Sequence, residues 1–345
     1  MALLPTALFG STENMTVSSI SRDMALHQAV ARAILAPSVH NTQPWRFVLN
    51  PDGLDFFADR TRQLAVLDPT GRQLYLSAGC ALLNARESLA DSGVTSTVRR
   101  FPDQSNPELV ARIEIGTGDA ADPALAALDP AVELRQTNRR RFADDTVPEE
   151  LLRTLQAGAS AEGAVLHPVT DEVDRQTLAR LNQKADVAQI TNPAYRAELR
   201  AWTSNDPARL DGVRAAVVPH VDGTSGDEMP IRDFDTQGAG WLPAQTRSSA
   251  SQCLLVLGTE ADTRESWLRA GEALERVWLE ITRAGLVASL FTQVIEVAAL
   301  RLQLRDELRL GMQPHVILRV GRAPVTASSM RRHVGEVLED RTRGR

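Results

Sequence analysis

Residues 36–47 read Ala-Pro-Ser-Val-His-Asn-Thr-Gln-Pro-Trp-Arg-Phe. Before them, apolar residues at helical spacing predict a helix over residues 23–35. After them, residues 45–49 are typical of a strand. Pro37 disfavours the α conformation in the residue before it, so the helix should end there. This stretch therefore predicts an extended loop that joins a helix to a strand.

The side chains of this loop suit the binding of a heterocycle. Ser38 provides a hydroxyl group and His40 an imidazole. Asn41 and Gln43 each provide a carboxamide, which presents a donor and an acceptor side by side. Such groups match a ring edge on which C=O and N–H groups alternate. A polar connection that only caps the helix would account for Ser38, but not for the cluster of polar residues before Trp45.

Composition narrows the class of protein. The 345 residues are 43% hydrophobic and 24% charged, which is ordinary for a soluble globular protein. A net charge of −6 argues against nucleic acid or an anionic membrane as partner. No apolar run approaches the roughly 20 residues that span a bilayer, and Cys80 and Cys253 are expected to be reduced thiols. No metal-ligand spacing is found. We expect a cytoplasmic protein whose partners are small molecules.

The order of elements occurs twice along the chain. Residues 78–82 read Ala-Gly-Cys-Ala-Leu within a predicted helix that ends at Gly93. Residues 270–274 read Ala-Gly-Glu-Ala-Leu within a second predicted helix that ends at Gly285. Both pairs of landmarks are separated by 192 positions, since 270 − 78 and 285 − 93 are equal. The shared order and spacing favour an internal duplication.

A basic motif opens the second half. Residues 135–142 read Arg-Gln-Thr-Asn-Arg-Arg-Arg-Phe, directly before a helix predicted to start near Val147. Guanidinium groups bind phosphate oxygens in pairs and keep their charge. A solvated basic run is the simpler interpretation, but the position before a helix favours an anion-binding role.

Neither half repeats the motif of the other. Counting 122 residues back from Arg135 leads to Glu13, and counting 122 forward from Asn41 leads to Gly163. Each half therefore keeps an element that the other lacks, which predicts one binding site built from both halves.

The loop resembles the APSxxNxQPW signature of nitroreductase-like flavoproteins, and residues 135–139 resemble the R-R-S-x-R/K motif of that family. The fused, unequal halves resemble its Acg branch in particular. The resemblance covers residues 21–335. It implies an α+β, nitroreductase-like fold in which two degenerate copies are fused in one chain and mimic the family homodimer, so that the chain acts as a monomer.

The resemblance also implies a division of the chain. We expect a flexible N-terminal tail over residues 1–20, a first lobe over 21–130 and a second lobe over 131–345. Residues 203–247 are rich in helix breakers and show little periodicity, as is typical of a functional or irregular insertion. This insertion is expected either to cover the site as a lid, anchored by Trp241, or to be a surface excursion.

By the same resemblance the chain would bind one FMN. Arg135 would meet the phosphate, and Arg139 would lie near the N1/C2=O edge, where positive charge stabilises reduced flavin. Arg331 and Arg332 would add a second basic pair, or belong to a solvated tail. No side chain is expected to be catalytic, because flavin N5 carries the chemistry. The residues expected to bind FMN are Pro37, Ser38, His40, Asn41, Gln43, Arg135, Gln136, Thr137, Arg139, Phe291, Thr292, Gln293, Arg331 and Arg332.

Two functions follow from the resemblance. The first is an NAD(P)H-dependent oxidoreductase that reduces nitroaromatic or quinone-type acceptors through flavin N5. The second is an FMN-binding or storage protein whose lid covers the flavin and leaves little reductase activity. A fold without any cofactor is a third alternative, which the complementary motifs of the two halves disfavour.

Overall fold

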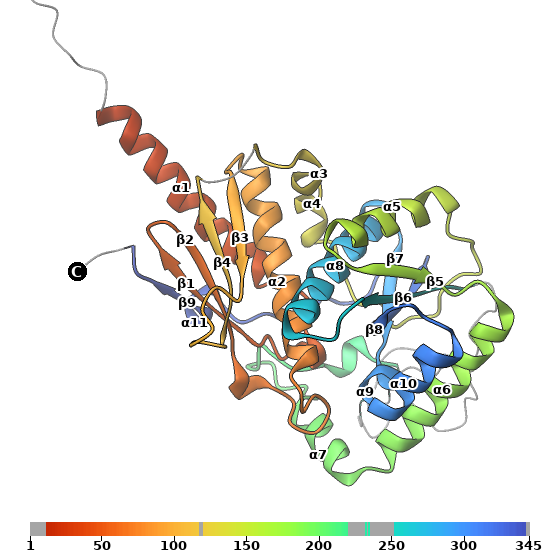
Figure 1. Ribbon diagram of the computed structural model, residues 1–345. Coiled ribbons are helices and arrows are strands. Elements are labelled where there is room, and N and C mark those ends of the chain that lie inside the picture. The colour runs from red at the N-terminus through yellow and green to blue at the C-terminus, as the bar shows by residue number, and fades with distance from the viewer. Residues whose placement is uncertain (1–11, 117–119, 220–231, 233, 235–251, 343–345) are drawn as a thin grey trace, which may run out of the picture.

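Figure 1 shows the computed structural model, which describes residues 12–116, 120–219, 232, 234 and 252–342. Trp241, the predicted lid anchor, lies outside the described residues, as does most of the segment 220–247. The described residues form helices and two separate sheets, so the predicted α+β class is confirmed. No helix among them is long and apolar enough to cross a bilayer.

The first lobe is a five-stranded sheet packed against two long helices. The first helix begins at Thr12, within the stretch that the sequence assigned to an N-terminal tail. The turn at Pro51-Asp52 joins two strands as a hairpin. The elements of this lobe are α1 (Thr12–Ala33), η1 (Val39–Asn41), β1 (Trp45–Asn50), β2 (Gly53–Ala58), η2 (Arg60–Arg62), α2 (Arg72–Asp91), β3 (Ser96–Arg100) and β4 (Leu109–Ile115).

The second lobe is a four-stranded sheet with helices on both sides (Figure 1). Two short helices, α3 (Pro123–Ala126) and α4 (Asp129–Val132), lead into it. Its elements are α5 (Glu149–Ala161), β5 (Val165–Pro168), α6 (Glu172–Ile190), α7 (Pro193–Ala201), η3 (Ala215–Val217), β6 (Cys253–Thr259), α8 (Arg264–Arg283), β7 (Val287–Phe291), α9 (Gln293–Glu296), α10 (Ala298–Glu307) and β8 (Gln313–Gly321).

The two sheets have the same strand order. It is β3-β4-β2-β1 in the first and β7-β8-β6-β5 in the second, and all these neighbours are antiparallel. Even an irregularity is repeated: the register shifts between Phe56 and Phe57 in β2 and between Leu257 and Gly258 in β6. The two sheets thus share one topology, which agrees with the repeated order of elements in the sequence.

The C-terminal segment crosses from one lobe to the other. After β8 the chain passes through α11 (Val334–Val337) into β9 (Leu338–Asp340), which pairs in parallel with β1 at the edge of the first sheet. The predicted boundary placed all of residues 131–345 in the second lobe, so it missed this exchange. The strap of residues 322–333 is thereby held between the lobes.

Helices α2 and α8 pack against each other at the centre of the molecule (Figure 1). Both of their ends are related by the offset of 192 positions. A Cβ atom on Gly79 would lie 2.0 Å from the backbone oxygen of Leu268, and one on Gly271 would lie 2.0 Å from that of Leu76. The contact is reciprocal, as in a twofold interface. One apolar core continues from the first lobe through these helices into the second.

This contact predicts that Gly271→Ala destabilises the chain by about 3 kcal/mol or more, because the new methyl group would collide with backbone and the helices would have to separate. Urea denaturation of both proteins measures the difference. Gly311→Ala is the matched control, since a Cβ atom there meets nothing within 4 Å. Equal stability of the Gly271 variant and wild type would contradict the tight crossing.

Candidate functional site

The loop after α1 has a strained backbone. His40, Asn41 and Gln43 have positive φ angles of 47°, 54° and 50°, a region that non-glycine residues rarely adopt. The sequence predicted an extended loop, but residues 39–41 form the tight turn η1. The hydroxyl group of Ser38 accepts a hydrogen bond from the amide of Gln43 at 2.9 Å and closes the turn. Strain of this kind persists where surrounding contacts fix it, and it is common at functional sites.

The two carboxamides of the loop bind other parts of the chain. Asn41 Nδ2 donates to the carbonyl oxygens of Gly212 and Met330, both at 3.1 Å, and its Oδ1 accepts from Arg331 at 3.2 Å. Gln43 is fully buried, and its Nε2 donates to Leu210 O at 2.8 Å. These groups hold the insertion and the C-terminal strap against the loop, and their predicted contact with a heterocycle stays a prediction.

Arg332 belongs to the same anchoring network. Its amide donates to Gln43 Oε1 at 2.7 Å, and its guanidinium donates to the carbonyl oxygens of Gln43 at 2.6 Å and Trp45 at 3.1 Å. Neither Arg332 nor Gln43 lines the cavities described next. Both residues therefore position the loop, and their predicted contact with a ligand stays a prediction.

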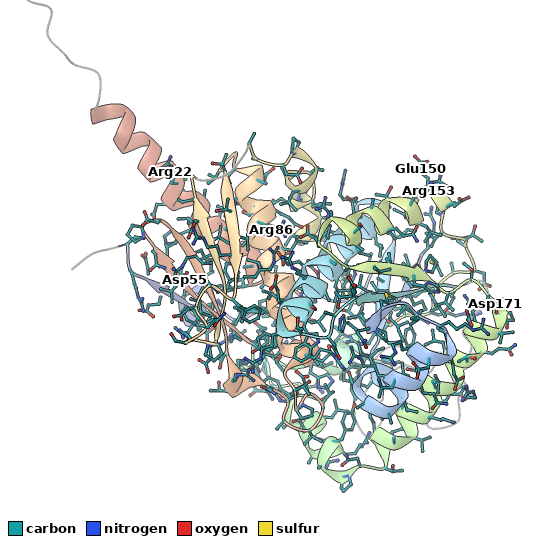
Figure 2. All side chains as sticks on the ribbon, in the orientation of Figure 1. Arg22, Asp55, Arg86, Glu150, Arg153 and Asp171 are labelled. Carbon is teal, nitrogen blue, oxygen red and sulfur yellow. The ribbon has the colours of Figure 1, made fainter. Side chains whose placement is uncertain are left out.

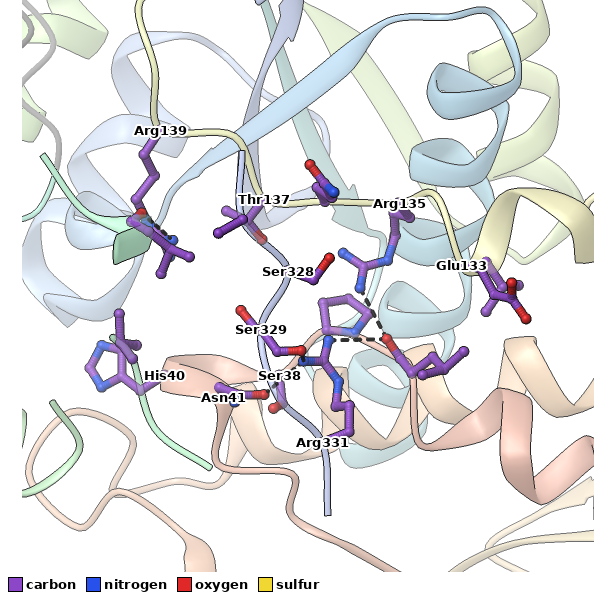
Figure 3. A pocket seen from close by; sticks show the side chains of 17 residues that line it. Ser38, His40, Asn41, Glu133, Arg135, Thr137, Arg139, Ser328, Ser329 and Arg331 are labelled. Carbon is purple, nitrogen blue, oxygen red and sulfur yellow. Dashed lines mark hydrogen bonds between the residues drawn. The ribbon is translucent and has the colours of Figure 1, made fainter. Parts of the chain in front are cut away.

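Two adjacent cavities lie between the lobes, with volumes of about 140 and 100 Å³. Figure 3 shows the first cavity, where the loop of the first lobe faces residues 135–139 of the second lobe and residues 327–331 of the strap. The two motifs that the sequence assigned to one site are thus brought together. The predicted residues that line this cavity are Pro37, Ser38, His40, Asn41, Arg135, Gln136, Thr137, Arg139 and Arg331.

The second cavity adjoins the first. It shares Pro37, Ser38, His40, Thr137 and Arg139 with the first cavity. Further walls come from α2, α8, β7, β8 and the end of α9.

Of the segment predicted to approach flavin N5, only part reaches the second cavity. Thr292 lines it, whereas Phe291 and Gln293 are buried and line neither cavity. Phe291 faces Arg319 in the core, with the guanidinium 5.2 Å from the ring centre. Thr292 is thus the one of these three that lines a cavity, and the predicted contacts of Phe291 and Gln293 stay predictions.

Two guanidinium groups converge at one end of the first cavity (Figure 3). Arg135 is buried; its Nε lies 3.0 Å from Glu275 Oε1, and its guanidinium lies over the Trp278 ring. Arg135 and Arg331 each donate to the carbonyl oxygen of Leu35, both at 3.1 Å. The carboxylate of Glu275 offsets one of these two charges, and the other is left facing the cavity.

Positive charge is in excess along the cavities. Among the described residues, no carboxylate forms an ion pair with Arg139 or Arg331, and Glu133 at the cavity edge is bound by Arg32. Burial, with a contribution from Arg135, lowers the pKa of Arg331 to about 9. Burial and Arg232 lower the pKa of Arg139 to about 10. An anionic ligand would stabilise both charges, and guanidinium groups such as those of Arg135 and Arg331 are well suited to bind phosphate oxygens.

His40 has an unpartnered imidazole ring at the other end. Its exposed fraction is 8%, and neither ring nitrogen has a hydrogen-bond partner among the described residues. Burial, Arg232 and Arg139 hold its pKa well below the ordinary value, so the ring is neutral, with one donor and one acceptor nitrogen. Buried polar groups are nearly always hydrogen-bonded in native proteins. The ring is therefore available to a bound ligand.

Sequence reasoning missed two residues of the insertion that reach the second cavity. Arg232 donates to Glu296 at 2.7 Å, to Thr292 Oγ1 at 2.9 Å and to the hydroxyl group of Tyr195. Phe234 packs edge-on against His40, with 5.9 Å between ring centres, and lies 4.8 Å from the guanidinium of Arg139. No spacing could have revealed these contacts, because they join segments that are far apart in the sequence.

The buried neutral His40 predicts a pH dependence of stability. Below about pH 6.5 the unfolded chain binds a proton at His40 that the folded chain excludes, so stability falls as the pH falls. His40→Gln should reduce this slope by about 1.4 kcal/mol per pH unit between about pH 6 and 5.

Urea denaturation of the ligand-free proteins at several pH values measures the slope. His315→Gln is a parallel variant outside the site and should have a similar effect, because burial, Arg301 and Arg72 lower the pKa of His315 to about 3. If the free energy of unfolding of the His40 variant depended on pH as in wild type, the ring would have the same pKa in the folded and unfolded chains.

Comparison with known proteins assigns the chain to a family. No protein-family model matches it. It is 36% identical to the Mycobacterium tuberculosis protein named "Putative NAD(P)H nitroreductase Rv3131" over 319 residues, which are 89% of each chain. It is 28% identical to "Putative NAD(P)H nitroreductase acg" of the same organism over 326 residues, 92% of this chain and 96% of the relative.

Solved structures of nitroreductases also match, at low similarity. A nitroreductase with bound FMN from Desulfitobacterium hafniense matches with a TM-score of 0.38 and 10% identity, over 60% of this chain and 96% of that chain. The family assignment follows from the sequence identity and not from this match. With 36% identity to Rv3131 across 89% of both chains, the protein belongs to the nitroreductase-like family, in its Acg branch.

Proposed function

We propose that the protein binds FMN between its two lobes and acts as an NAD(P)H-dependent oxidoreductase. The observation that carries this proposal is the pair of adjoining cavities. Among the described residues, Arg331 at one end has no carboxylate partner, and the imidazole of His40 at the other end has no hydrogen-bond partner. The dianionic phosphate and the polar ring of FMN require these two kinds of partner. The names of the relatives, which specify NAD(P)H, support that reductant class.

The residues of the first cavity would hold the phosphate. Arg135 and Arg331 supply positive charge, and Ser328 and Ser329 of the strap add hydroxyl groups on the same wall (Figure 3). Because Glu275 already offsets the charge of Arg135, Arg331 makes the larger net contribution to anion binding. The strap and the second lobe would therefore grip the phosphate together.

The second cavity would hold the ring. His40 and Arg139 provide polar contacts, while Leu274 and Leu290 provide apolar walls that exclude water. FMN, when bound, supplies hydride transfer between NAD(P)H and a nitroaromatic or quinone-type acceptor. Arg139 has no carboxylate partner among the described residues, so its charge would stabilise negative charge on a ligand at this end. No side chain of the cavity is needed as a general acid or base.

A second candidate function is flavin storage. It is favoured by one observation: Phe234 of the insertion lies against His40 and Arg139, and Arg232 fastens the same segment to Glu296. A segment held there would limit the space above the ring that a second substrate needs. In this alternative the protein still binds FMN, but reductant reaches it poorly. The predicted lid is thus retained as a proposal, with Phe234 in contact with the site.

Removal of the Arg331 charge tests the phosphate assignment. Arg331→Met should weaken FMN binding on the order of 30-fold, as expected for the loss of a charge-assisted hydrogen bond of about 2 kcal/mol. Isothermal titration of the flavin-free proteins measures the affinity. Arg322→Met is the matched control, because Arg322 is exposed and pairs with Asp145 away from the cavities. Equal affinities of the Arg331 variant and wild type would place the phosphate elsewhere.

Anaerobic mixing of FMN-loaded protein with NADPH or NADH separates the two functions. An oxidoreductase should lose its flavin absorbance band within seconds, because reductant enters the second cavity. A storage protein should keep the band until dithionite is added. Arg232→Met should speed the reduction in the storage case, since it releases the segment from Glu296. A purified chain that takes up no FMN would refute both functions.

A further inference from the structure

The repeat relates each wall of the second cavity to a position in the other half of the molecule. Helices α2 and α8, and strands β3 and β7, correspond with the offset of 192 positions, and the strand registers agree with it. Cys80 of α2, which lines the second cavity, therefore corresponds to Glu272 of α8. Thr292, directly after β7, corresponds to Arg100, the last residue of β3. A small thiol and a hydroxyl group face a cavity in one half, whereas a carboxylate and a guanidinium stand in the other.

These two charged residues bind each other. Arg100 donates from Nε to Glu272 Oε2 at 2.7 Å and from its NH2 group to Oε1 at 2.9 Å, which is a bidentate pair. Arg86 of α2 donates to the same carboxylate at 2.7 Å. Glu272 has an exposed fraction of 0%, so the pair fills the interior and does not lie on the surface. Figure 2 labels Arg86, which lies between the two lobes.

The carboxylate of Glu162 extends this network. It lies where the second lobe would carry a counterpart of the loop between α1 and β1. Only residues 162–164 connect α5 to β5, whereas residues 34–44 connect α1 to β1. A constant offset of 122 positions was assumed from the sequence, which led from Asn41 to Gly163. That assumption is wrong, because the connection in the second lobe is shorter. In this short turn Glu162 accepts from Arg86 at 2.6 Å and from Arg276 at 2.8 Å, and its exposed fraction is 2%.

We propose that this ion-pair cluster occupies the counterpart of the second cavity and closes it to a cofactor, so that the chain has a single flavin site. The cluster comprises Arg86, Arg100, Glu162, Glu272 and Arg276. The inference rests on the proposed function for the identity of the ligand that is excluded. The position and contacts of the cluster do not depend on it.

The cluster also links the two halves. Arg86 and Arg100 belong to the first lobe, and Glu162, Glu272 and Arg276 belong to the second. Each bridge between Arg86 or Arg100 and a glutamate therefore crosses the central interface. Removal of one member leaves a buried charge without its partner, which is strongly destabilising. The same contacts thus have two effects: they close the counterpart of the second cavity, and they hold the two lobes together.

The first experiment counts flavins. The flavin-free full chain is titrated with FMN, and the bound FMN per chain is determined from absorbance after removal of free ligand. One FMN per chain is expected. Two FMN per chain would overturn the inference, because the counterpart would then be open. If no FMN binds, the proposed function fails, and the second experiment decides the inference about the cluster by itself.

The second experiment is a double-mutant cycle across the interface. Arg100→Met and Glu272→Gln should each raise the unfolding equilibrium constant on the order of 100-fold or more. The double variant should raise it at least about tenfold less than the product of the two single effects, since the partners are in direct contact. If the glutamine variant does not fold, Glu272→Asp replaces it in the cycle.

A matched control uses the exposed pair of Glu149 and Arg153 on α5, which should show almost no coupling. Coupling between Arg100 and Glu272 as small as in this control would overturn the inference, whatever the FMN count, because the cluster would then contribute nothing to closing the interface. One FMN per chain together with strong coupling supports it.

Discussion

The reciprocal contact of Gly79 and Gly271 is the constraint on which the rest of the structure depends. Only glycine allows the backbones of α2 and α8 to approach so closely, because any Cβ atom would meet a carbonyl oxygen of the facing helix. This approach brings the loop after α1 within reach of residues 135–139 of the other lobe. It also fixes the two sheets relative to each other through one shared core. The cavities exist because the two lobes meet here.

Around this nearly symmetric centre the charges are distributed asymmetrically. On one side the cavities are lined by Arg139 and Arg331, which have no carboxylate partner among the described residues. On the other side Glu162 and Glu272 pair with arginines and fill the interior. The same backbone framework thus presents an unsatisfied positive site in one half and a satisfied cluster in the other. The difference comes from side-chain identity and from the length of one connection, not from the fold.

The loop and the strap depend on each other. Three positive φ angles near His40 would be unfavourable in an isolated peptide. They are held by the hydrogen bonds of Asn41 and Gln43 to the insertion and the C-terminal strap. The strap in turn delivers Arg331 to the first cavity and continues into β9 of the first sheet. Anchoring residues and ligand-facing residues therefore alternate along two short segments.

The sequence by itself determined the repeat, the C-terminal ends of α2 and α8 and the two motifs, because periodicity, glycine caps and local composition are local properties of a chain. It also indicated that the loop and residues 135–139 share a site. Only the tertiary structure decided which side chains face the cavities: Gln43 and Arg332 bind each other, whereas Arg232 and Phe234 arrive from the insertion. The exchange of β9 and the pairing of Arg100 with Glu272 were likewise hidden. Such contacts depend on how distant segments pack, which neither spacing nor composition encodes.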